Sequence, residues 1–287
     1  MLIVSYGRLV FFVYFDPCGL DGFDRFERSD RQHHNLFKPF SMPIFALTDR
    51  LQFPPPHLAT KEGLLAVGGD LGQQRLLLAY REGIFPWFSD GEPILWWSPD
   101  PRLVLYPNEM HLSASLKKRI RQNRFRLSAD RAFDAVIAEC RRVPRKHQEG
   151  TWIVASMVDA YQRLHRNGFA HSIEAWQDRQ LVGGLYGVSL GRCFFGESMF
   201  SRVSDASKIA LAGLVQFLAI LGFKLIDCQV PTAHLATLGA REIPRRRFLS
   251  ELEKALKKKT VAGSWTGLYD RLADEHRLPT PAWPPCT

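Results

Sequence analysis

Cysteine is scarce in this chain, and its spacing suits neither a disulfide framework nor a metal site. The five cysteines are odd in number and scattered, and none forms the C-x-x-C spacing of zinc and redox motifs. They are Cys18, Cys140, Cys193, Cys228 and Cys286. The sequence therefore predicts a protein of the reducing cytoplasm that binds no metal.

Long apolar runs and nucleotide-binding motifs are also missing. Residues 209–223 form the longest near-continuous apolar stretch, but Gln216 interrupts it, and it falls short of the roughly 18 residues that span a bilayer. No Walker A motif or H-E-x-x-H occurs, and residues 67–72 lack the spacing of a dinucleotide fingerprint. The sequence thus predicts neither an integral membrane protein nor a need for ATP, NAD or another cofactor.

Acidic residues are outnumbered by basic ones. The 38 Lys and Arg residues against 29 Asp and Glu give a formal net charge of +9, which makes a polyanionic partner worth considering. Residues 112–128 carry basic side chains with no acid among them, and this run is either a solvated face or a phosphate-facing surface. The basic residues of the run are Lys117, Lys118, Arg119, Arg121, Arg124 and Arg126.

A length of 287 residues predicts about two domains. Residues 1–41 mix apolar and charged residues without a period, so we expect a poorly ordered extension or a misassigned start, with Met42 as the true first residue. Residues 42–110 are dense in Pro, Gly and Trp and predict a small loop-rich α/β domain, whose one helix begins at Asp70 as N-cap and ends at Gly83. Residues 111–260 form the main domain, and a Pro-rich tail, 261–287, is expected to be loosely held.

The main domain alternates helical and strand patterns. Helical spacing of apolar residues and period-two alternation predict an antiparallel hairpin or meander flanked by helices, with one helix apolar nearly all round and therefore buried. The result is an α+β fold whose order is compatible with an acetyltransferase-like (GNAT-type) mixed sheet with packed helices. The expected helices are 133–140, 157–166, 208–221 and 247–258, and the expected strands are 170–176, 180–188, 193–200 and 225–230.

Two glycine patterns resemble known motifs without completing them. Residues 187–191 match G-x-S-x-G around Ser189, but a serine hydrolase needs a helix directly after this turn. A strand is expected there instead, so a hairpin turn is the better interpretation. Residues 180–185 come close to the pyrophosphate loop of acetyl-CoA enzymes and fail at its last position, which indicates an acyl donor other than CoA.

Polar residues in apolar surroundings mark candidate sites. Asp227 and Gln229 lie two apart on an expected strand, so both side chains should point to one face. They are either a satisfied structural pair or a site, because burial makes each costly without a partner. Glu197 lies between Phe195 and Met199 on another strand, and a surface strand would explain it equally well.

Aromatic residues gather in 83–87 and 96–102, around Trp87 and Trp96. This cluster is either a rigid turn or a stacking platform for a nucleobase, in which Arg102 would meet a phosphate.

Together these segments resemble the leucyl/phenylalanyl-tRNA protein transferases. The resemblance runs from Phe53 to about Phe248 and rests on long motifs in order: GLLAVGGDL, GIFPWF, ILWWSPDPR, GTWI, AYQRLH, AHSIE, LVGGLYGV, FFGESMFS, ASKIAL, LIDCQV, HLATLGA and IPRRRF. It implies an enzyme that moves Leu or Phe, with Met left open as a third donor, from aminoacyl-tRNA to the α-amine of proteins beginning with Arg or Lys. Such proteins are thereby marked for degradation. The enzyme is expected to be cytoplasmic and monomeric.

The same resemblance implies roles for particular residues. Trp87 would stack on the terminal adenosine of the tRNA, and the basic run would meet tRNA phosphates, together with residues 245–247 and 257–259. Glu197, Asp227 and Gln229 would line the place where the acceptor amine meets the ester. We hypothesise that Asp227 orients Gln229 and accepts or relays charge from the amine, while Gln229 holds the ester and Glu197 meets the cationic acceptor. The apolar pocket for the amino-acid side chain would use Trp152, Leu185, Phe194, Gly196, Met199, Leu214, Leu218 and Ile226.

Strand parity sets a condition on this pocket. Phe194 and Met199 have opposite parity, so they can share a pocket only if the strand bulges, with Gly196 as the expected place. Leu214 and Leu218 stand where some relatives carry Phe, which leaves the Leu against Phe preference open. Rival interpretations are an acyl-CoA or cross-bridge N-acyltransferase on the same fold, and a tRNA-binding protein without enzymatic activity.

Overall fold

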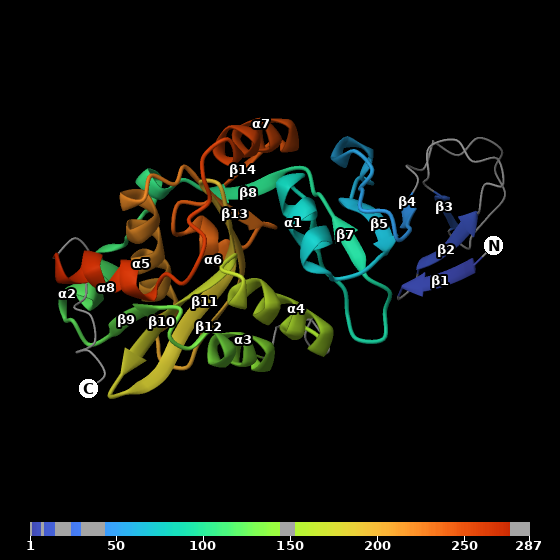
Figure 1. Ribbon diagram of the computed structural model, residues 1–287. Helices are drawn as coiled ribbons and strands as arrows, with labels where there is room; N and C mark the ends of the chain where they lie inside the picture. The colour runs from blue at the N-terminus through green and yellow to red at the C-terminus, as the bar shows by residue number, and fades with distance from the viewer. Residues whose placement is uncertain (1, 7–8, 15–23, 30–43, 144–152, 276–287) are drawn as a thin grey trace. The chain divides into compact units, whose positions relative to one another are not determined.

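The computed structural model describes residues 44–143 and 153–275, and in addition the backbone of residues 2–6, 9–14 and 24–29. The chain divides into two compact units, Met1–Pro101 and Arg102–Thr287 (Figure 1). This boundary falls before the expected one at residue 110, because Arg102–Leu105 is a strand that pairs within the second unit.

The first unit is built on a sheet with the strand order β1-β2-β3-β4-β5-β7-β6. Trp96 on β7 is completely buried, and its indole Nε1 donates to the carbonyl of Gly68 at 2.9 Å. The predicted helix is present as α1, Gln73–Arg81, followed by Gly83 with a φ of 72°. Its N-cap is Gly72 rather than Asp70, whose carboxylate accepts from the Gly72 N–H at 2.6 Å instead. The remaining elements are β1 Leu2–Tyr6, β2 Leu9–Tyr14, β3 Asp24–Ser29, β4 Ile44–Leu47, η1 Pro56–Leu58, β5 Leu64–Gly68, β6 Phe85–Pro86 and β7 Leu95–Trp97.

The second unit is a mixed seven-stranded sheet with the order β14-β8-β13-β12-β11-β10-β9. Strands β10, β11 and β12 form the expected antiparallel meander, and β12 pairs in parallel with β13 after the crossover through α5. An α+β fold with a mixed sheet is thus confirmed. Its strands are β8 Arg102–Leu105, β9 Arg126–Ala129, β10 Ala170–Gln177, β11 Gln180–Leu190, β12 Cys193–Ser201, β13 Leu225–Gln229 and β14 Arg241–Ile243. Its helices are η2 Pro107–Glu109, α2 Ala114–Arg121, α3 Phe133–Arg142, α4 Ala155–Arg166, α5 Ala206–Ile220, α6 Ala233–Ala236, α7 Arg245–Leu256 and α8 Thr266–Asp274.

Helices cover both faces of this sheet. A Cβ added to Gly183 on β11 would lie 2.6 Å from Ala206 of α5, whereas one added to Gly184 would lie 3.2 Å from Val136 of α3. Successive residues of a strand face opposite sides, so α3 and α5 pack on opposite faces. α5 is buried along most of its length, as its apolar sequence predicts. No helix among the described residues is long and apolar enough to cross a membrane.

Residues 264–275 differ from the expected loosely held tail, because they are packed against the second unit. Trp265, Tyr269 and Leu272 are buried and follow a helical spacing, and α8 packs them against the sheet beside β9. The backbone N–H of Trp265 donates to Asp130 at 2.7 Å, and the indole stacks on the ring of His171 at 3.7 Å between centroids. The prolines of the tail suggested a segment without regular structure, although a short amphipathic helix precedes them. Residues 276–287 lie outside the described residues.

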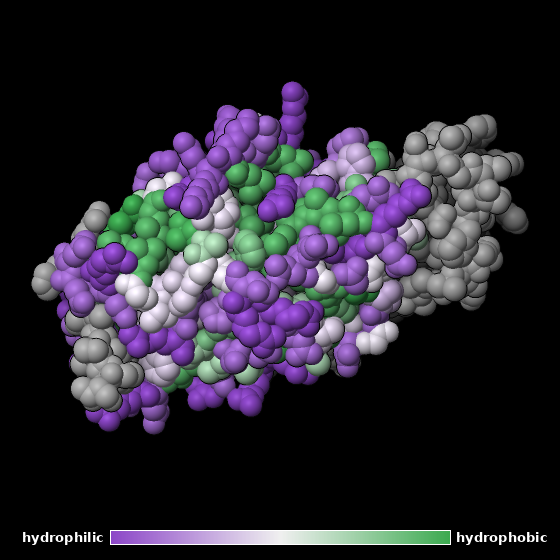
Figure 2. Space-filling view, viewed as in Figure 1, coloured by the Kyte–Doolittle hydropathy of each residue, from purple (hydrophilic) through white to green (hydrophobic). Residues whose placement is uncertain are grey.

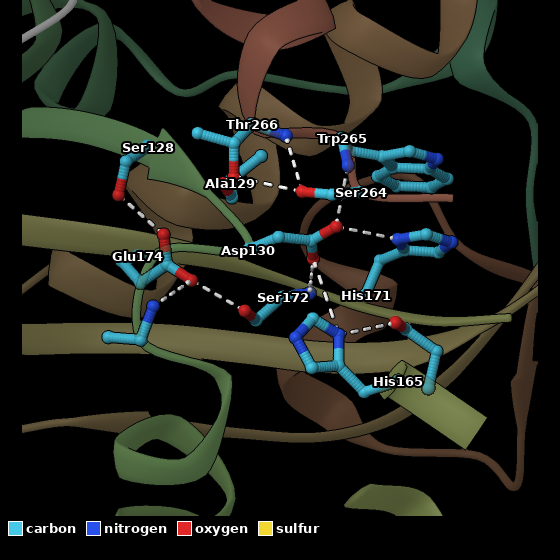
Figure 3. Close-up of polar contacts among 12 residues, drawn as sticks. Ser128, Ala129, Asp130, His165, His171, Ser172, Glu174, Ser264, Trp265 and Thr266 are labelled. Carbon is cyan, nitrogen blue, oxygen red and sulfur yellow. Dashed lines mark hydrogen bonds and ion pairs between the residues drawn. The ribbon is translucent and has the colours of Figure 1, made fainter. Parts of the chain in front are cut away.

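A buried polar cluster joins β9, β10 and the start of α3 (Figure 3). The carboxyl group of Glu174, fully buried on β10, accepts from Ser128 and Ser172 and from the Ala132 N–H at the N-terminus of α3. Burial raises the pKa of Glu174 to about 7, and the two serine hydrogen bonds oppose that rise. Glu174 is therefore protonated in a large fraction of molecules near neutral pH.

This pKa predicts a specific pH dependence of stability. The unfolded state ionises near the ordinary value of 4.5 and the folded state near 7. Between these values the folded state binds more protons, so the contribution of Glu174 is fully present below pH 4.5 and declines as pH rises to 7. We expect Glu174→Gln to abolish this decline, so that between pH 5 and 8 the variant gains about 2 to 3 kcal/mol of unfolding free energy relative to wild type.

Urea denaturation across that pH range checks the prediction. Glu253→Gln, at a side chain that is 72% exposed, serves as the matched control and should leave the pH slope unchanged. Parallel slopes for wild type and Glu174→Gln would contradict the assignment.

Candidate active site

The centre of the candidate site is Asp227 on β13, held by Arg102 on the neighbouring strand β8. Arg102 Nε donates to Asp227 Oδ1 at 2.8 Å, and Arg102 Nη2 donates to Oδ2 at 2.7 Å. Both side chains are completely buried. This parallel two-bond geometry is the strongest arrangement that arginine and a carboxylate form.

This pairing bears on two expectations. Arg102 does not face a phosphate from an aromatic platform, because its guanidinium is buried against Asp227 and over the ring of Phe248, 4.6 Å from the centroid. None of the Asp227 side chain is exposed, an arrangement that favours a positioning role over direct contact with an acceptor amine. The hypothesis gave Asp227 two tasks, to orient Gln229 and to take charge from the amine. The geometry favours the first task.

Gln229 follows a bulge that strict strand alternation did not predict. Asp227 pairs with Val104 and Gln229 with Leu103, so Cys228 is the extra residue. The φ of Gln229 is 64°, the left-handed region that residues other than glycine rarely adopt. Its backbone N–H donates to Asp227 Oδ1 at 2.9 Å. Asp227 therefore contacts Gln229 through the Gln229 backbone. Because the bulge interrupts the regular strand, alternation no longer predicts that the two side chains share a face.

The side chain of Gln229 leads to Glu197 on β12. Gln229 Nε2 donates to Glu197 Oε1 at 2.9 Å, and the hydroxyl of Tyr161 on α4 donates to Glu197 Oε2 at 2.9 Å. Glu197 is half-buried. The three predicted polar residues thus form one connected network, to which the structure adds Arg102 and Tyr161.

The predicted bulge in β12 is confirmed. Tyr186 pairs with Ser198 while Gly187 pairs with Gly196, so Glu197 is the extra residue next to Gly196. This bulge carries Glu197 out of the regular strand. It also lets residues of opposite parity on β12 reach one apolar cluster.

The predicted apolar pocket residues come together on the face that α5 covers. Leu185 pairs with Met199, and Phe194 pairs with Ile226, across neighbouring strands. The same cluster includes Leu214 and Leu218 of α5, with Met199 packed against it. Trp152 lies outside the described residues.

Other nucleophiles in this part of the chain are unsuited to catalysis. Ser189 is completely buried on the continuous strand β11, which turns into β12 rather than into a helix. The nucleophile elbow of a hydrolase is therefore absent, as expected. Burial and the neighbouring Asp227 raise the pKa of the Cys228 thiol, so this thiol stays protonated and weakly nucleophilic. No group of His, Cys, Asp or Glu residues suited to a metal ion occurs among the described residues.

The predicted tRNA-contact residues lie on each unit's surface. In the first unit Trp87 is partly exposed, and its ring lies 5.8 Å from that of Trp97, whose Nε1 donates to the Trp87 carbonyl at 2.7 Å. In the second unit the basic run lies on α2, the turn after it and the first residue of β9. Arg119 there pairs with Asp205 at 3.6 Å. The exposed members of the run are Lys117, Lys118, Arg121, Arg124 and Arg126.

A second basic surface follows α7. Figure 2 shows hydrophilic side chains over this helix. Arg246, Arg247 and Lys254 are exposed on it, while Phe248 and Leu252 are buried beneath. The buried side of α7 thus reaches Arg102. Its outer side carries Arg246 and Lys254 beside the ion pairs Arg247–Glu251 and Lys257–Glu253, so basic residues outnumber acidic ones there.

Comparison with known proteins gives consistent matches. A family model described as "Leucyl/phenylalanyl-tRNA protein transferase" matches residues 104–253, and one described as the N-terminal domain of that protein matches residues 69–100. The leucyl/phenylalanyl-tRNA–protein transferase of Syntrophobacter fumaroxidans is 59% identical over 226 residues, which cover 79% of this chain and 97% of that protein. The protein of the same name from Desulfatibacillum aliphaticivorans is 59% identical over 78% of this chain and 97% of its own.

Among solved structures, that of L-PGS from Bacillus licheniformis covers 60% of this chain and 55% of its own at 13% identity. Its TM-score of 0.34 is too low to carry an argument.

Proposed function

The chain belongs to the leucyl/phenylalanyl-tRNA protein transferase family, and from this premise we propose that Gln229, Glu197 and the buried Arg102–Asp227 pair form its reaction centre. The protein is an enzyme with leucyl/phenylalanyl-tRNA–protein transferase activity. The observation that carries the assignment of the centre is the continuous hydrogen-bonded path from Arg102 through Asp227 and Gln229 to Glu197.

The reaction joins an amine to an activated ester. The neutral α-amine of the acceptor protein attacks the carbonyl carbon of the aminoacyl ester, and the new C–N bond forms as the bond to the ribose oxygen of the tRNA breaks. The amine loses a proton, and the departing ribose oxygen gains one. Because an α-amine has a pKa near ~8 and the ester is already activated, positioning and deprotonation supply most of what is needed.

The roles of the side chains follow from what each can still contact. The Gln229 amide is polar, is held by its hydrogen bond to Glu197, and is suited to hold the ester oxygen. Glu197 is half-buried, and its carboxylate accepts from the Gln229 amide. A carboxylate at this place suits a cationic acceptor that begins with Arg or Lys. Asp227 is completely buried and positions Gln229 by accepting from its backbone N–H.

The donor and the setting complete the proposal. The apolar cluster around Phe194 and Met199 suits a Leu or Phe side chain, with Met as a further donor, because a methylene or ring difference in such a pocket discriminates by only ~1–3 kcal/mol. We assign the second unit to the acetyltransferase-like (GNAT-type) folds, and the donor, aminoacyl-tRNA, is consistent with an enzyme of the cytoplasm. Trp87 would stack on the terminal adenosine, and the products would be proteins marked for degradation.

The acceptor rule predicts the behaviour of Glu197→Gln. We expect the KM for a peptide beginning with Arg to rise about tenfold, because the neutral amide cannot pair with the guanidinium, while the KM for Leu-tRNA stays within about twofold. Steady-state transfer of labelled leucine to peptides beginning with Arg, Lys or Glu measures both constants. A peptide beginning with Glu should be a poor acceptor for the wild-type enzyme. An unchanged acceptor KM in Glu197→Gln would remove Glu197 from the acceptor site.

The phosphate role predicts a salt effect at α2. Lys117→Glu/Lys118→Glu should raise the KM for Leu-tRNA about tenfold and flatten its dependence on salt concentration, because fewer counterions are released on binding. Lys61→Glu/Lys224→Glu changes the net charge equally at exposed lysines elsewhere and is the matched control. Equal behaviour of the two double variants would show that net charge alone matters.

A further inference from the structure

The buried guanidinium of Arg102 has more contacts than a simple ion pair needs. Its Nε and Nη2 engage the two oxygens of Asp227 at 2.8 and 2.7 Å, and its planar face lies over Phe248 of α7. Strand β8, which begins at Arg102, also pairs with β13 and β14. The orientation of Arg102 is therefore fixed from several sides, and with it the orientation of the Asp227 carboxylate.

The carboxylate in turn fixes an unfavourable backbone conformation. Asp227 Oδ1 accepts from both Arg102 Nε and the Gln229 N–H, so a single oxygen links the arginine to the bulge. Gln229 is left-handed there, with a φ of 64°. A residue with a side chain holds this conformation only where its surroundings over-determine it. Two hydrogen bonds hold it here: the Gln229 N–H donates to Asp227 Oδ1 at 2.9 Å, and the Val230 N–H donates across Gln229 to the Cys228 carbonyl at 2.8 Å.

The backbone of Gln229 sets where its side chain begins, and the amide of that side chain contacts Glu197. Gln229 Nε2 donates to Glu197 Oε1 at 2.9 Å, and Glu197 is itself the extra residue of the bulge in β12. Two bulges on neighbouring strands thus face each other through one hydrogen bond. A shift of the Asp227 carboxylate would move the amide that the proposed function places at the ester.

We propose that Arg102 is a positioning residue for aminoacyl transfer, which acts through Asp227 on the left-handed backbone of Gln229. The proposal rests on the proposed role of Gln229 at the ester. In this proposal the guanidinium must engage both oxygens of Asp227 at once, and positive charge alone is not sufficient. Lysine would supply the charge without the fork that engages both oxygens of Asp227.

The test compares Arg102→Lys with wild type in leucine transfer from Leu-tRNA to a peptide beginning with Arg. We expect kcat to fall between tenfold and a hundredfold, while the KM values for tRNA and peptide stay within about twofold. Arg75→Lys is the matched control, because Arg75 is likewise buried and bonded to an aspartate, Asp70, at 2.8 Å in the first unit. Its kcat should stay within twofold of wild type. A wild-type kcat in folded Arg102→Lys would overturn the proposal.

Two further variants separate positioning from folding. In the Asp227→Asn background, adding Arg102→Lys should change kcat by less than twofold, because both changes break the same path; multiplicative losses would contradict the proposal. Arg102→Met/Asp227→Leu replaces the buried pair by apolar side chains, which should keep the unfolding midpoint near wild type. Its kcat should still fall at least a hundredfold, and an active, stable double variant would show that the pair is only structural.

These outcomes also distinguish this proposal from the function on which it rests. If Gln229→Gly kept the wild-type kcat, the reaction centre would be misplaced. If Gln229→Gly lost activity while Arg102→Lys kept it, only the role of Arg102 would be wrong.

Discussion

Asp227→Asn is expected to lose about 3 kcal/mol of unfolding free energy and at least a hundredfold in kcat. The amide would place an NH2 group against a guanidinium N–H and leave the charge of Arg102 buried without a counterion. Breaking a buried ion pair from one side costs about 3 to 5 kcal/mol in proteins. The loss in kcat follows because the broken contact with Arg102 Nη2 no longer fixes the side-chain oxygen that accepts from the Gln229 N–H.

Urea denaturation and single-turnover leucine transfer measure the two losses separately. Asp70→Asn is the matched control, since Asp70 also pairs with a buried arginine but its own side chain is 60% exposed. Its loss of stability should be below about 1 kcal/mol, because exposed charges are screened by water. A loss in kcat of less than tenfold for Asp227→Asn, or about 1.4 kcal/mol, would mean that the carboxylate is dispensable for the reaction.

Gln229→Gly is expected to lower kcat by about a hundredfold to a thousandfold, the range found when one positioned donor is removed from a site of charge development. Glycine adopts a φ of 64° without steric cost, so this variant keeps the backbone and removes only the amide. Gln229→Ala removes the amide and adds backbone strain.

The pair of variants separates two explanations of the loss. If the amide acts at the ester, both variants lose activity to a similar degree in single-turnover transfer. If the conformation of the bulge is what matters, Gln229→Gly stays active and Gln229→Ala does not. The second pattern would contradict the role proposed for the side chain.

Much of the second unit could be predicted from periodicity. The strands from β10 to β13 and the helix α5 follow apolar patterns that local sequence encodes well. The sequence shows α2 only as a run of basic residues, because a helix with Leu116 as its one buried residue has no apolar periodicity. α8 was hidden by the prolines of the tail, although Trp265, Tyr269 and Leu272 carry its helical spacing.

The candidate site was predictable in its residues and not in its connections. Asp227 and Gln229 stood out as polar groups in an apolar strand, and the resemblance gave them a role. Arg102 lies 125 residues before Asp227, so local sequence does not predict the ion pair. The one local signal is an arginine directly before the apolar run Leu103–Val104–Leu105. Tyr161 lies within the expected helix 157–166, and nothing in the sequence indicates that its hydroxyl donates to Glu197, although a buried tyrosine hydroxyl needs a partner.

The two bulges show why alternation alone could not place the side chains. In β12 the parity conflict between Phe194 and Met199 exposed a bulge, and the structure has it beside Gly196. In β13 no such conflict existed, because Asp227 and Gln229 shared a parity. The bulge at Cys228 depends on pairing with β8, a strand far away in sequence, and on the Asp227 hydrogen bond.

The central claim is that this protein forms a peptide bond between leucine from Leu-tRNA and a free α-amine, at the centre that contains Gln229. The measurement that tests it most directly follows radiolabelled leucine from Leu-tRNA to a peptide beginning with Arg, beside the same peptide with its α-amine acetylated, for wild type and Gln229→Gly. The account predicts transfer by the wild type to the free amine only, with the rate reduced at least a hundredfold in the variant. Transfer to the acetylated peptide, or equal rates for the two enzymes, would contradict it.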